Sequence, residues 1–261
     1  WNGNTYTSSG TYSYNVINNA VNNIYSLEFN GNNDYLSLIN PGGYSNASGF
    51  SINAWINSTS TSASFDAILS GSCSDFFFGI NHLGKLQIGR NCAGGNQNLI
   101  GNTNLNDGNW HFVSVTYDGL DMILYVDGQV EASALNISWW LNLVPGSELA
   151  IAREPHAAVS YFDGYLDDIS FWSRSLSQSE IQNYINCPIV PNSDLIAYWN
   201  FEGAWNPVLD VSGNGNHGTY NGAPLYHWNV PPQSCVVGLT NVNGCDSTAI
   251  LNLTLEICGC T

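Results

Sequence analysis

The stretch GYLDDISFWSRSLSQSEI, residues 164–181, decides the fold, because it joins a strand pattern directly to a helix start. Apolar and polar residues alternate through its first half, which is typical of a β-strand. In its second half, Ser177 precedes Glu180 by three residues, the spacing of a capping box at a helix N-terminus. The residues that follow give the expected helix a single apolar face: Ile181, Tyr184 and Ile185.

The rest of the chain reads as short strands separated by turns rich in Gly, Asn and Asp. The Asp127–Gly128 pair between two alternating runs is typical of a tight β-hairpin. Turn signals recur about every ten residues, as expected for a sandwich. The sequence therefore predicts an all-β protein, an antiparallel β-sandwich of the jelly-roll kind with one short helix. The clearest strand patterns are YSLEFNG (25–31), DYLSLIN (34–40), FSINAWINS (50–58), GNWHFVSVTYDG (108–119), MILYVDGQVEAS (122–133) and LIAYWNFEG (195–203).

The charge balance limits the partners that the protein can have. The formal net charge is −16, and the cationic side chains are four: Lys85, Arg90, Arg153 and Arg174. Because no basic patch is available to contact phosphates, the composition disfavours nucleic acid as a partner. Cations are favoured instead, calcium first among them, since it prefers carboxylate and carbonyl oxygens. No apolar run is long enough for a membrane span.

The cysteines indicate an oxidising, extracellular setting, and the protein is expected to be secreted. Cys73 and Cys92 flank one expected hairpin, and Cys187 and Cys235 bracket another segment, so these are the two expected disulfide pairs. The remaining cysteines make the total of seven odd, so that at least one thiol is free or pairs outside this chain: Cys245, Cys258 and Cys260.

Several motifs in series resemble one family. The order YSLEFNGNNDYLSL, FSINAWINS, LNDGNWHFVSVTYDG, MILYVDGQVEAS, LAIA and GYLDDISFWSRSLSQSEI resembles the concanavalin A-like, laminin G/pentraxin-type jelly-roll domains of secreted bacterial proteins, over residues 24–187. The segment LIAYWNFEGAWNPVLDVSGNGNHGTYNGA also resembles this family, in which it usually precedes FNGNNDYL. Here it follows the expected helix, and so it is either a permuted edge of the sandwich or the start of a further repeat.

The two ends resemble each other more than they resemble the middle. The head WNGNTYTSSGTYSYN and the tail NGCDSTAILNLTL resemble repeat modules of very large Bacteroidetes surface proteins. This resemblance implies a piece of a tandem array, secreted and held at the cell surface. It divides the chain into a head hairpin of a flanking module (1–23), a laminin G-like sandwich (24–230) and tail strands of a flanking module (231–261).

The residues do not favour catalysis. The glucanases that this family resembles carry a Glu-x-Asp-x-x-Glu pattern, which this sequence lacks. Asp167 and Asp168 are adjacent, so on a regular strand they would point to opposite faces and could not act as a pair. The five histidines have no metal-ligand spacing, and no Gly-x-Ser-x-Gly motif is present. We therefore expect a protein that is not an enzyme.

The resemblance implies a structural calcium ion. By position, Asp34, with Asn33 and Gly31, would share the ion with Asp167 or Asp168. The alternative is that Asp34 caps a turn and that the adjacent acids mark a strand end. A second set of loop oxygens is better explained as a polar turn: Asp210, Asn214, Asn216 and His217.

The candidate ligand-binding residues lie in two expected loops. Trp139 and Trp140 are adjacent in one, and the other contains Arg153, His156 and Tyr161. Aromatic rings with polar neighbours suit a sugar site. The alternative for both tryptophans is packing over an open edge of the sandwich, or contact with a protein neighbour. Other tryptophans in strand patterns are expected in the core: Trp55, Trp110, Trp172 and Trp199.

Three functions remain open at this level. The first is a non-catalytic adhesion module of a large secreted surface protein, stabilised by calcium and binding a surface glycan or protein. The second is a structural subunit or spacer of an extracellular fibre or appendage, whose partners are neighbouring repeats or copies of the same protein. The third is a carbohydrate-binding module attached to a polysaccharide-degrading enzyme.

Overall fold

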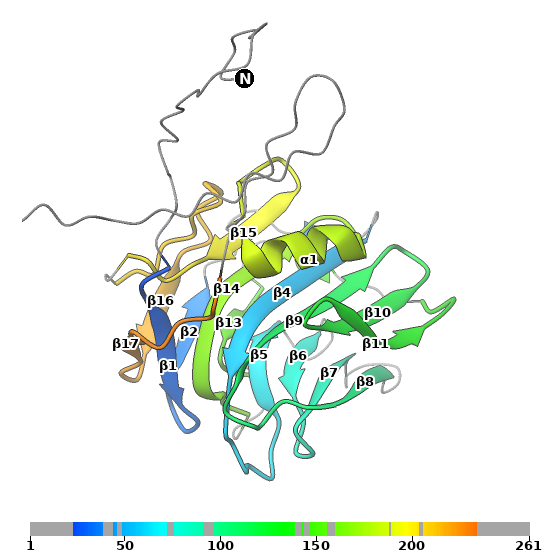
Figure 1. Cartoon of the computed structure of the whole chain (residues 1–261). Coiled ribbons are helices and arrows are strands. Elements are labelled where there is room, and N and C mark those ends of the chain that lie inside the picture. Colours follow the sequence, from blue (N-terminus) through cyan, green and yellow to red (C-terminus); the bar gives the residue numbers. More distant parts are fainter. Residues whose placement is uncertain are drawn as a thin grey trace, which may run out of the picture.

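A computed structural model describes residues 23–38, 44–45, 49–71, 76–90, 97–138, 142–143, 147–155, 160–187, 189–203 and 206–233 (Figure 1). These residues form two antiparallel sheets that pack face to face, with one helix on the outer face of the first sheet. The predicted antiparallel β-sandwich with one short helix is confirmed. Within this part of the chain, no helix is long and apolar enough to cross a membrane.

The first sheet has eight strands. In spatial order they are β11 (Gln129–Ala134), β10 (Met122–Val126), β9 (Trp110–Tyr117), β4 (Phe50–Asn57), β14 (Asp163–Trp172), β1 (Ser26–Asn30) and β17 (Leu225–His227), and β15 (Leu195–Trp199) also pairs with β14.

The second sheet has seven strands. Their order is β16 (Gly218–Asn221), β2 (Tyr35–Leu38), β13 (Leu149–Ile151), β5 (Asp66–Ser70), β6 (Phe77–Ile80), β7 (Lys85–Arg90) and β8 (Gln97–Asn104). A two-stranded ribbon consists of β3 (Tyr44–Ser45) and β12 (Asn142–Leu143).

The main core lies between the two sheets. Alternate residues of β4 face it, and Phe50, Ile52, Ala54 and Ile56 have no exposed surface. The other face of β4 is also buried, because a second apolar cluster forms there. This outer cluster contains Trp55, Phe112, Tyr125, Trp172, Leu176, Ile181, Ile189, Leu195 and Tyr198.

The helix α1 (Gln178–Asn186) covers this outer cluster. The predicted capping box is present: Ser177 Oγ accepts the Glu180 N–H at 3.3 Å, and the Ser177 N–H donates to Glu180 Oε2 at 2.8 Å. Ile181 is fully buried, and Tyr184 stacks on Trp172 with 5.4 Å between ring centroids. The expected apolar face of the helix is therefore the face that docks on the sheet.

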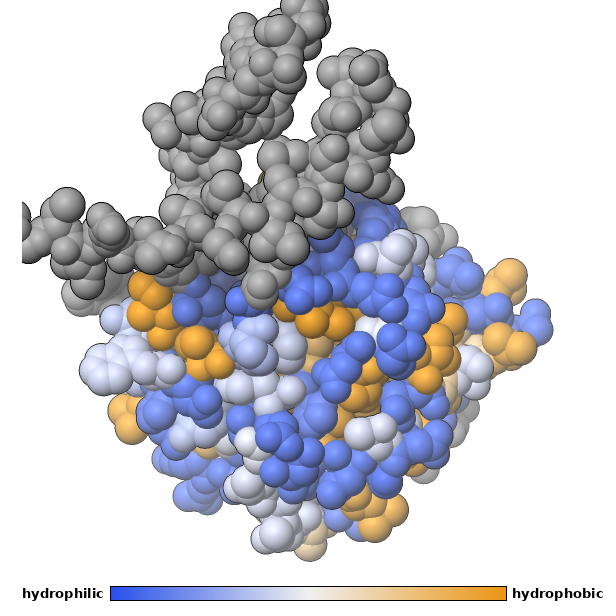
Figure 2. Space-filling model, in the orientation of Figure 1, coloured by the Kyte–Doolittle hydropathy of each residue, from blue (hydrophilic) through white to orange (hydrophobic). Residues whose placement is uncertain are grey.

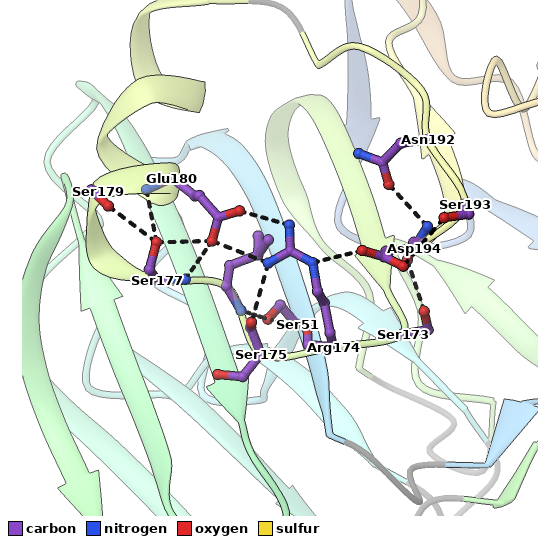
Figure 3. Close-up of polar contacts among 11 residues, drawn as sticks. Ser51, Ser173, Arg174, Ser175, Ser177, Ser179, Glu180, Asn192, Ser193 and Asp194 are labelled. Carbon is purple, nitrogen blue, oxygen red and sulfur yellow. Dashed lines mark hydrogen bonds and ion pairs between the residues drawn. The ribbon is translucent and has the colours of Figure 1, made fainter.

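Arg174 connects the end of β14 to the helix and to the turn before β15 (Figure 3). Its guanidinium group donates to both carboxylate oxygens of Glu180, at 2.6 and 3.1 Å, and to Asp194 Oδ2 at 3.0 Å. These contacts lower the pKa of Glu180 to about 2, with the hydrogen bonds from Arg174 as the largest cause. The bidentate pair is a geometry that lysine cannot reproduce.

The segment after the helix belongs to the same sandwich. β15 pairs with β14, β16 with β2, and β17 with β1. These pairings agree with a permuted edge and not with a further repeat. The Asp210 loop forms a polar turn, in which the Asp210 carboxylate accepts the N–H groups of Tyr198, Ser212 and Asn216 at 2.9–3.0 Å.

Cys187, just after α1, is disulfide-bonded, and its partner lies outside the described residues. The other cysteines that were expected to pair also lie outside the described residues: Cys73, Cys92 and Cys235. The two expected pairings therefore stay predictions.

The Arg174 contacts predict a measurable coupling between strand end and helix. At pH 7, Arg174→Gln and Glu180→Gln should each lower the free energy of unfolding by about 1 kcal/mol, a modest value because the pair is partly exposed. The double variant should lose less stability than the sum of the two single losses. The difference, measured by urea denaturation, should be a coupling of about 0.5–1 kcal/mol. Arg174→Gln combined with Glu148→Gln, which has no described contact with Arg174, should be additive. Full additivity in the first cycle would contradict the assigned role.

Candidate functional site

The adjacent acids lie where β14 changes its neighbour. β1 pairs with Asp163–Leu166 and β15 with Ile169–Trp172, so the change occurs at Asp167 and Asp168. The register against β4 shifts between Asp167 and Ser170, and Asp168 has a φ of 46°. This β-bulge breaks the alternation of side chains. The expectation that the two carboxylates point to opposite faces is therefore corrected: they lie in one buried cluster.

Both carboxylates accept hydrogen bonds from neighbouring groups. Asp167 Oδ1 accepts the Asp168 N–H at 2.8 Å, and the Asn23 amide also contacts the Asp167 carboxylate. Asp168 accepts the Tyr198 hydroxyl and, at 2.6 Å, the Gln233 amide. Burial, with the charge of Asp168 as a second cause, raises the pKa of Asp167 well above its usual range. Burial also raises the pKa of Asp168 to about 6.

The same cluster holds the two ends of the described sandwich together. Asn23 Nδ2 donates to Gln233 Oε1 at 3.3 Å, and Glu202 Oε1 accepts the N–H groups of Ile24 and Tyr25 at 2.8 and 3.2 Å. Asp167 has no exposed surface, so a substrate cannot reach it in this structure. We interpret the adjacent acids as a structural junction.

The expected calcium ligands fall into two separate groups. The register of β1 on β14 places Asn30 opposite Asp163 and Leu27 opposite Leu166, so the turn with Gly31, Asn33 and Asp34 lies at the other end of β1 from Asp167 and Asp168. In that turn Asp34 Oδ1 accepts the Ala223 N–H at 2.7 Å, and Asn33 Oδ1 accepts from Asn30 at 2.9 Å.

One ion shared by the turn and the bulge does not fit this arrangement. Within the described ranges, no group of three or more His, Cys, Asp or Glu side chains is placed to hold a metal ion. Asp34 instead ties its turn to the loop between β16 and β17. Calcium binding elsewhere, or at either group alone, stays a prediction.

Two of the expected ligand-binding residues lie together. Arg153 and Tyr161 form an isolated bridge, and the Arg153 guanidinium lies 4.7 Å from the Tyr35 ring centroid and 6.0 Å from that of Tyr161. Glu148 Oε1 lies 4.0 Å from the Arg153 Nη1 atom. The other expected ligand-binding residues lie outside the described part of the chain: Trp139, Trp140 and His156.

A pocket that these expectations missed opens on the outer face of the first sheet, beyond α1. Four neighbouring strands contribute one residue each to a single row: Glu28 is opposite Tyr165, Tyr165 opposite Asn57, and Asn57 opposite Trp110. Their neighbours in sequence, Leu27, Leu166 and Ile56, face the main core, so the row faces outward. The pocket has a volume of about 390 Å³ and is lined by Glu28, Phe29, Asn57, Thr59, Gly108, Asp163, Gly164, Tyr165 and Asn229.

Tyr165 is the central ring of this site. Its hydroxyl donates to Glu28 Oε1 at 3.1 Å, and its ring centroid lies 6.4 Å from that of Trp110 and 5.1 Å from that of His227. Burial, and then the hydrogen bond to Glu28, raise the pKa of Tyr165. The pocket lining thus combines the Tyr165 ring, which contacts Trp110 and His227, with carboxylate and amide groups.

The segment after β17 closes one side of the pocket, where it crosses the outer face of β1 and β14 (Figure 1). Ser26 Oγ donates to the Asn229 carbonyl at 2.6 Å, and Trp110 Nε1 donates to Asn229 Oδ1 at 3.1 Å. Trp228, between His227 and Asn229, is 79% exposed. Figure 2 shows that hydrophobic residues on this side of the molecule form small groups among hydrophilic ones.

The pocket also depends on a close approach of two strands. Gly164 has a φ of 135°, and a Cβ atom there would lie 2.3 Å from the backbone oxygen of Asn57. A side chain would therefore separate β14 from β4 beside the row. The glycine keeps Tyr165 and Asn57 on adjacent, tightly paired strands.

Sequence reasoning missed this row because strand alternation gives each residue a face but not its cross-strand neighbours. Trp110 was expected in the core, and it is instead half-buried on the outer face. Trp55, Trp172 and Trp199 are buried as expected.

The buried acids predict that the fold is more stable in mild acid. Their folded-state pKa values lie above the unfolded value of 3.8, so ionisation as pH rises toward about 6 weakens the fold. The free energy of unfolding should increase by about 1–3 kcal/mol between pH 7.5 and 5 in urea denaturation. Asp167→Asn should remove much of this increase, whereas Glu148→Gln, a surface change of the same charge, should keep it. An unchanged pH profile in Asp167→Asn would contradict the assignment.

Comparison with known proteins agrees with this architecture. Human neuronal pentraxin-1 is 27% identical over 103 residues, which is 36% of this chain and 24% of that protein. A Bacteroides ovatus protein proposed to bind carbohydrate has a TM-score of 0.65 and 22% identity, over 80% of this chain and 61% of that one. A heptameric SAP-like pentraxin from Limulus polyphemus has a TM-score of 0.56 and 15% identity, over 78% and 94%.

The chain thus matches about a quarter of the length of neuronal pentraxin-1 and less than two thirds of the length of the Bacteroides protein. A family model gives a more extensive match, over residues 30–182, which is more than half of the chain. That model describes the Laminin_G_3 family of the concanavalin A-like lectin/glucanase superfamily, and this chain belongs to that family.

Proposed function

We propose that this chain is a non-catalytic carbohydrate-binding module and that the outer-face pocket is its sugar site. The row Glu28, Tyr165, Asn57 and Trp110 carries this proposal. A sugar ring presents C–H groups that pack on aromatic rings and hydroxyl groups that hydrogen-bond to carboxylates and amides. Both kinds of partner meet in this pocket, whose volume of about 390 Å³ is in the range of small-molecule sites.

The comparisons support the fold on which such a site would stand. The likeness to the Bacteroides ovatus protein, at 22% identity, concerns the fold alone. The assignment of sugar binding to this chain therefore rests on the pocket. We extend the proposal to a secreted surface protein that contacts glycans outside the cell, because the acidic, lysine-poor composition and the disulfide at Cys187 suit that setting.

The position of the two ends favours a binding module over a linear spacer. Asn23 and Gln233 are in hydrogen-bond contact, and Ser26 lies opposite His227 on antiparallel strands. A spacer that adds length to a fibre needs its connections at opposite ends of the domain. Here the chain enters and leaves at one place, so the sandwich would project from whatever carries it and would present the pocket to solvent.

A pair of tyrosine variants tests the location of the site. Tyr165→Ala should weaken binding to the best ligand of a glycan array by tenfold or more, because it removes the central ring and a partner of Glu28. Tyr161→Ala, which alters the Arg153 cluster, should leave affinity within twofold. Isothermal titration of the whole chain would give both values, with circular dichroism as the check of folding. The reverse pattern would move the site to Arg153 and Tyr161.

Calcium binding is a separate part of the proposal. A bound structural ion at 100 times its dissociation constant would stabilise the fold by about 2.7 kcal/mol. We expect a higher melting temperature in millimolar calcium than in EDTA. Asp34→Asn and Asp167→Asn would show which of the two separated groups holds the ion, since one of them should abolish the shift. Identical melting curves in calcium and EDTA would remove calcium from the proposal.

A further inference from the structure

The pocket has carboxylates but no cation. Glu28 and Asp163 line it, and Asp163 is exposed. The four Lys and Arg side chains lie elsewhere. Lys85 and Arg90 are on β7 of the second sheet, Arg153 follows β13, and Arg174 lies just after the end of β14, before α1.

Neighbouring groups respond to this negative charge. The pKa of the buried Asp66 is raised to about 6, mainly by burial and further by the charge of Asp163. The pKa of Tyr165 is also raised, by burial and then by its contact with Glu28. At both residues the pocket carboxylates are a smaller cause beside burial, and they act in the direction expected for a negative neighbour.

The polar atoms of the pocket that remain available are mostly acceptors. Glu28 uses Oε1 for the Tyr165 hydroxyl and keeps Oε2, and Asp163 accepts from Ser58 through its backbone oxygen alone, so its carboxylate stays available among the described residues. Asn57 uses its Nδ2 for the Gly108 carbonyl, which leaves Oδ1. The available donors are fewer, namely Asn229 Nδ2 and the Thr59 hydroxyl.

A ligand for this pocket must therefore bring donors. Sugar hydroxyls donate hydrogen bonds, whereas carboxylate and sulfate groups only accept them and would face like charges. Building on the proposed function, we propose that the pocket binds glycans without acidic groups and excludes those that carry a carboxylate or sulfate beside the bound ring. The excluded class includes sulfated and uronic acid-rich polysaccharides.

Matched glycan pairs test this selectivity. The purified whole chain would be titrated, at pH 7.5 and low salt, with a neutral oligosaccharide and with the same oligosaccharide bearing one sulfate or sialic acid on the bound end. We expect at least tenfold weaker binding of the acidic member. Raising sodium chloride from about 20 to 500 mM should narrow this ratio, because screening weakens exposed charge repulsion. Equal or stronger binding of the acidic member would overturn the proposal.

A double variant removes the cause of the selectivity. Glu28→Gln with Asp163→Asn keeps side-chain shape and should bring the two affinities within about threefold. The control Glu148→Gln with Asp121→Asn removes the same number of charges outside the pocket and should retain the tenfold ratio. If the pocket variant kept the ratio, its carboxylates would not be responsible.

The result can be separated from failure of the proposed function. If the wild-type chain binds no glycan, or if Tyr165→Ala leaves its glycan binding unchanged, the sugar site itself is refuted. Binding that depends on Tyr165 and yet does not distinguish acidic from neutral members would refute the selectivity alone. The salt titration uses unmodified protein, so this test does not depend on folding of the double variant.

Discussion

The architecture depends on the exchange of neighbours along β14. The strand pairs with β4 on one side both before and after the bulge, but on its other side β1 gives way to β15 at Asp167 and Asp168. A regular strand cannot satisfy every backbone group where a neighbour ends, so a bulge with buried polar side chains forms there. The hydrogen bonds from Tyr198 and Gln233 offset part of the cost of burying Asp168, and the raised pKa values show that part of this cost remains.

This exchange also divides the outer face of the first sheet. Beyond the bulge, side chains of α1 and β15 pack with those of the sheet in the outer apolar cluster, which buries this part of the face. Before the bulge, β1 and β17 continue the sheet, and no helix covers the described residues there (Figure 1). Tyr165 remains partly exposed for this reason. The outer-face pocket and the buried acids are therefore two consequences of one topological feature, on either side of the same point in β14.

Features that depend on residues close together in the sequence could be predicted well, whereas features that depend on strand pairing could not. Ser177 and Glu180 specify their helix start through contacts three residues apart, and alternation in β4 specifies its core face. By contrast, a bulge at Asp167 and Asp168 is invisible in an alternating pattern, because its cause is the arrival of β15. The pocket row joins residues up to 137 positions apart, and only the registers of four strands bring them together.

The scarcity of cations links stability to recognition. Arg174 pairs with Glu180 at the helix junction, and the Arg153 guanidinium lies 4.7 Å from the Tyr35 ring centroid, so neither cation lies at the pocket. Burial raises the pKa values of Asp167 and Asp168, and among the described residues no cation lies beside them to offset that cost. The same scarcity leaves Glu28 and Asp163 without a cationic partner in the pocket. One property of the composition thus contributes both to the expected stability of the fold in mild acid and to the proposed preference for neutral glycans.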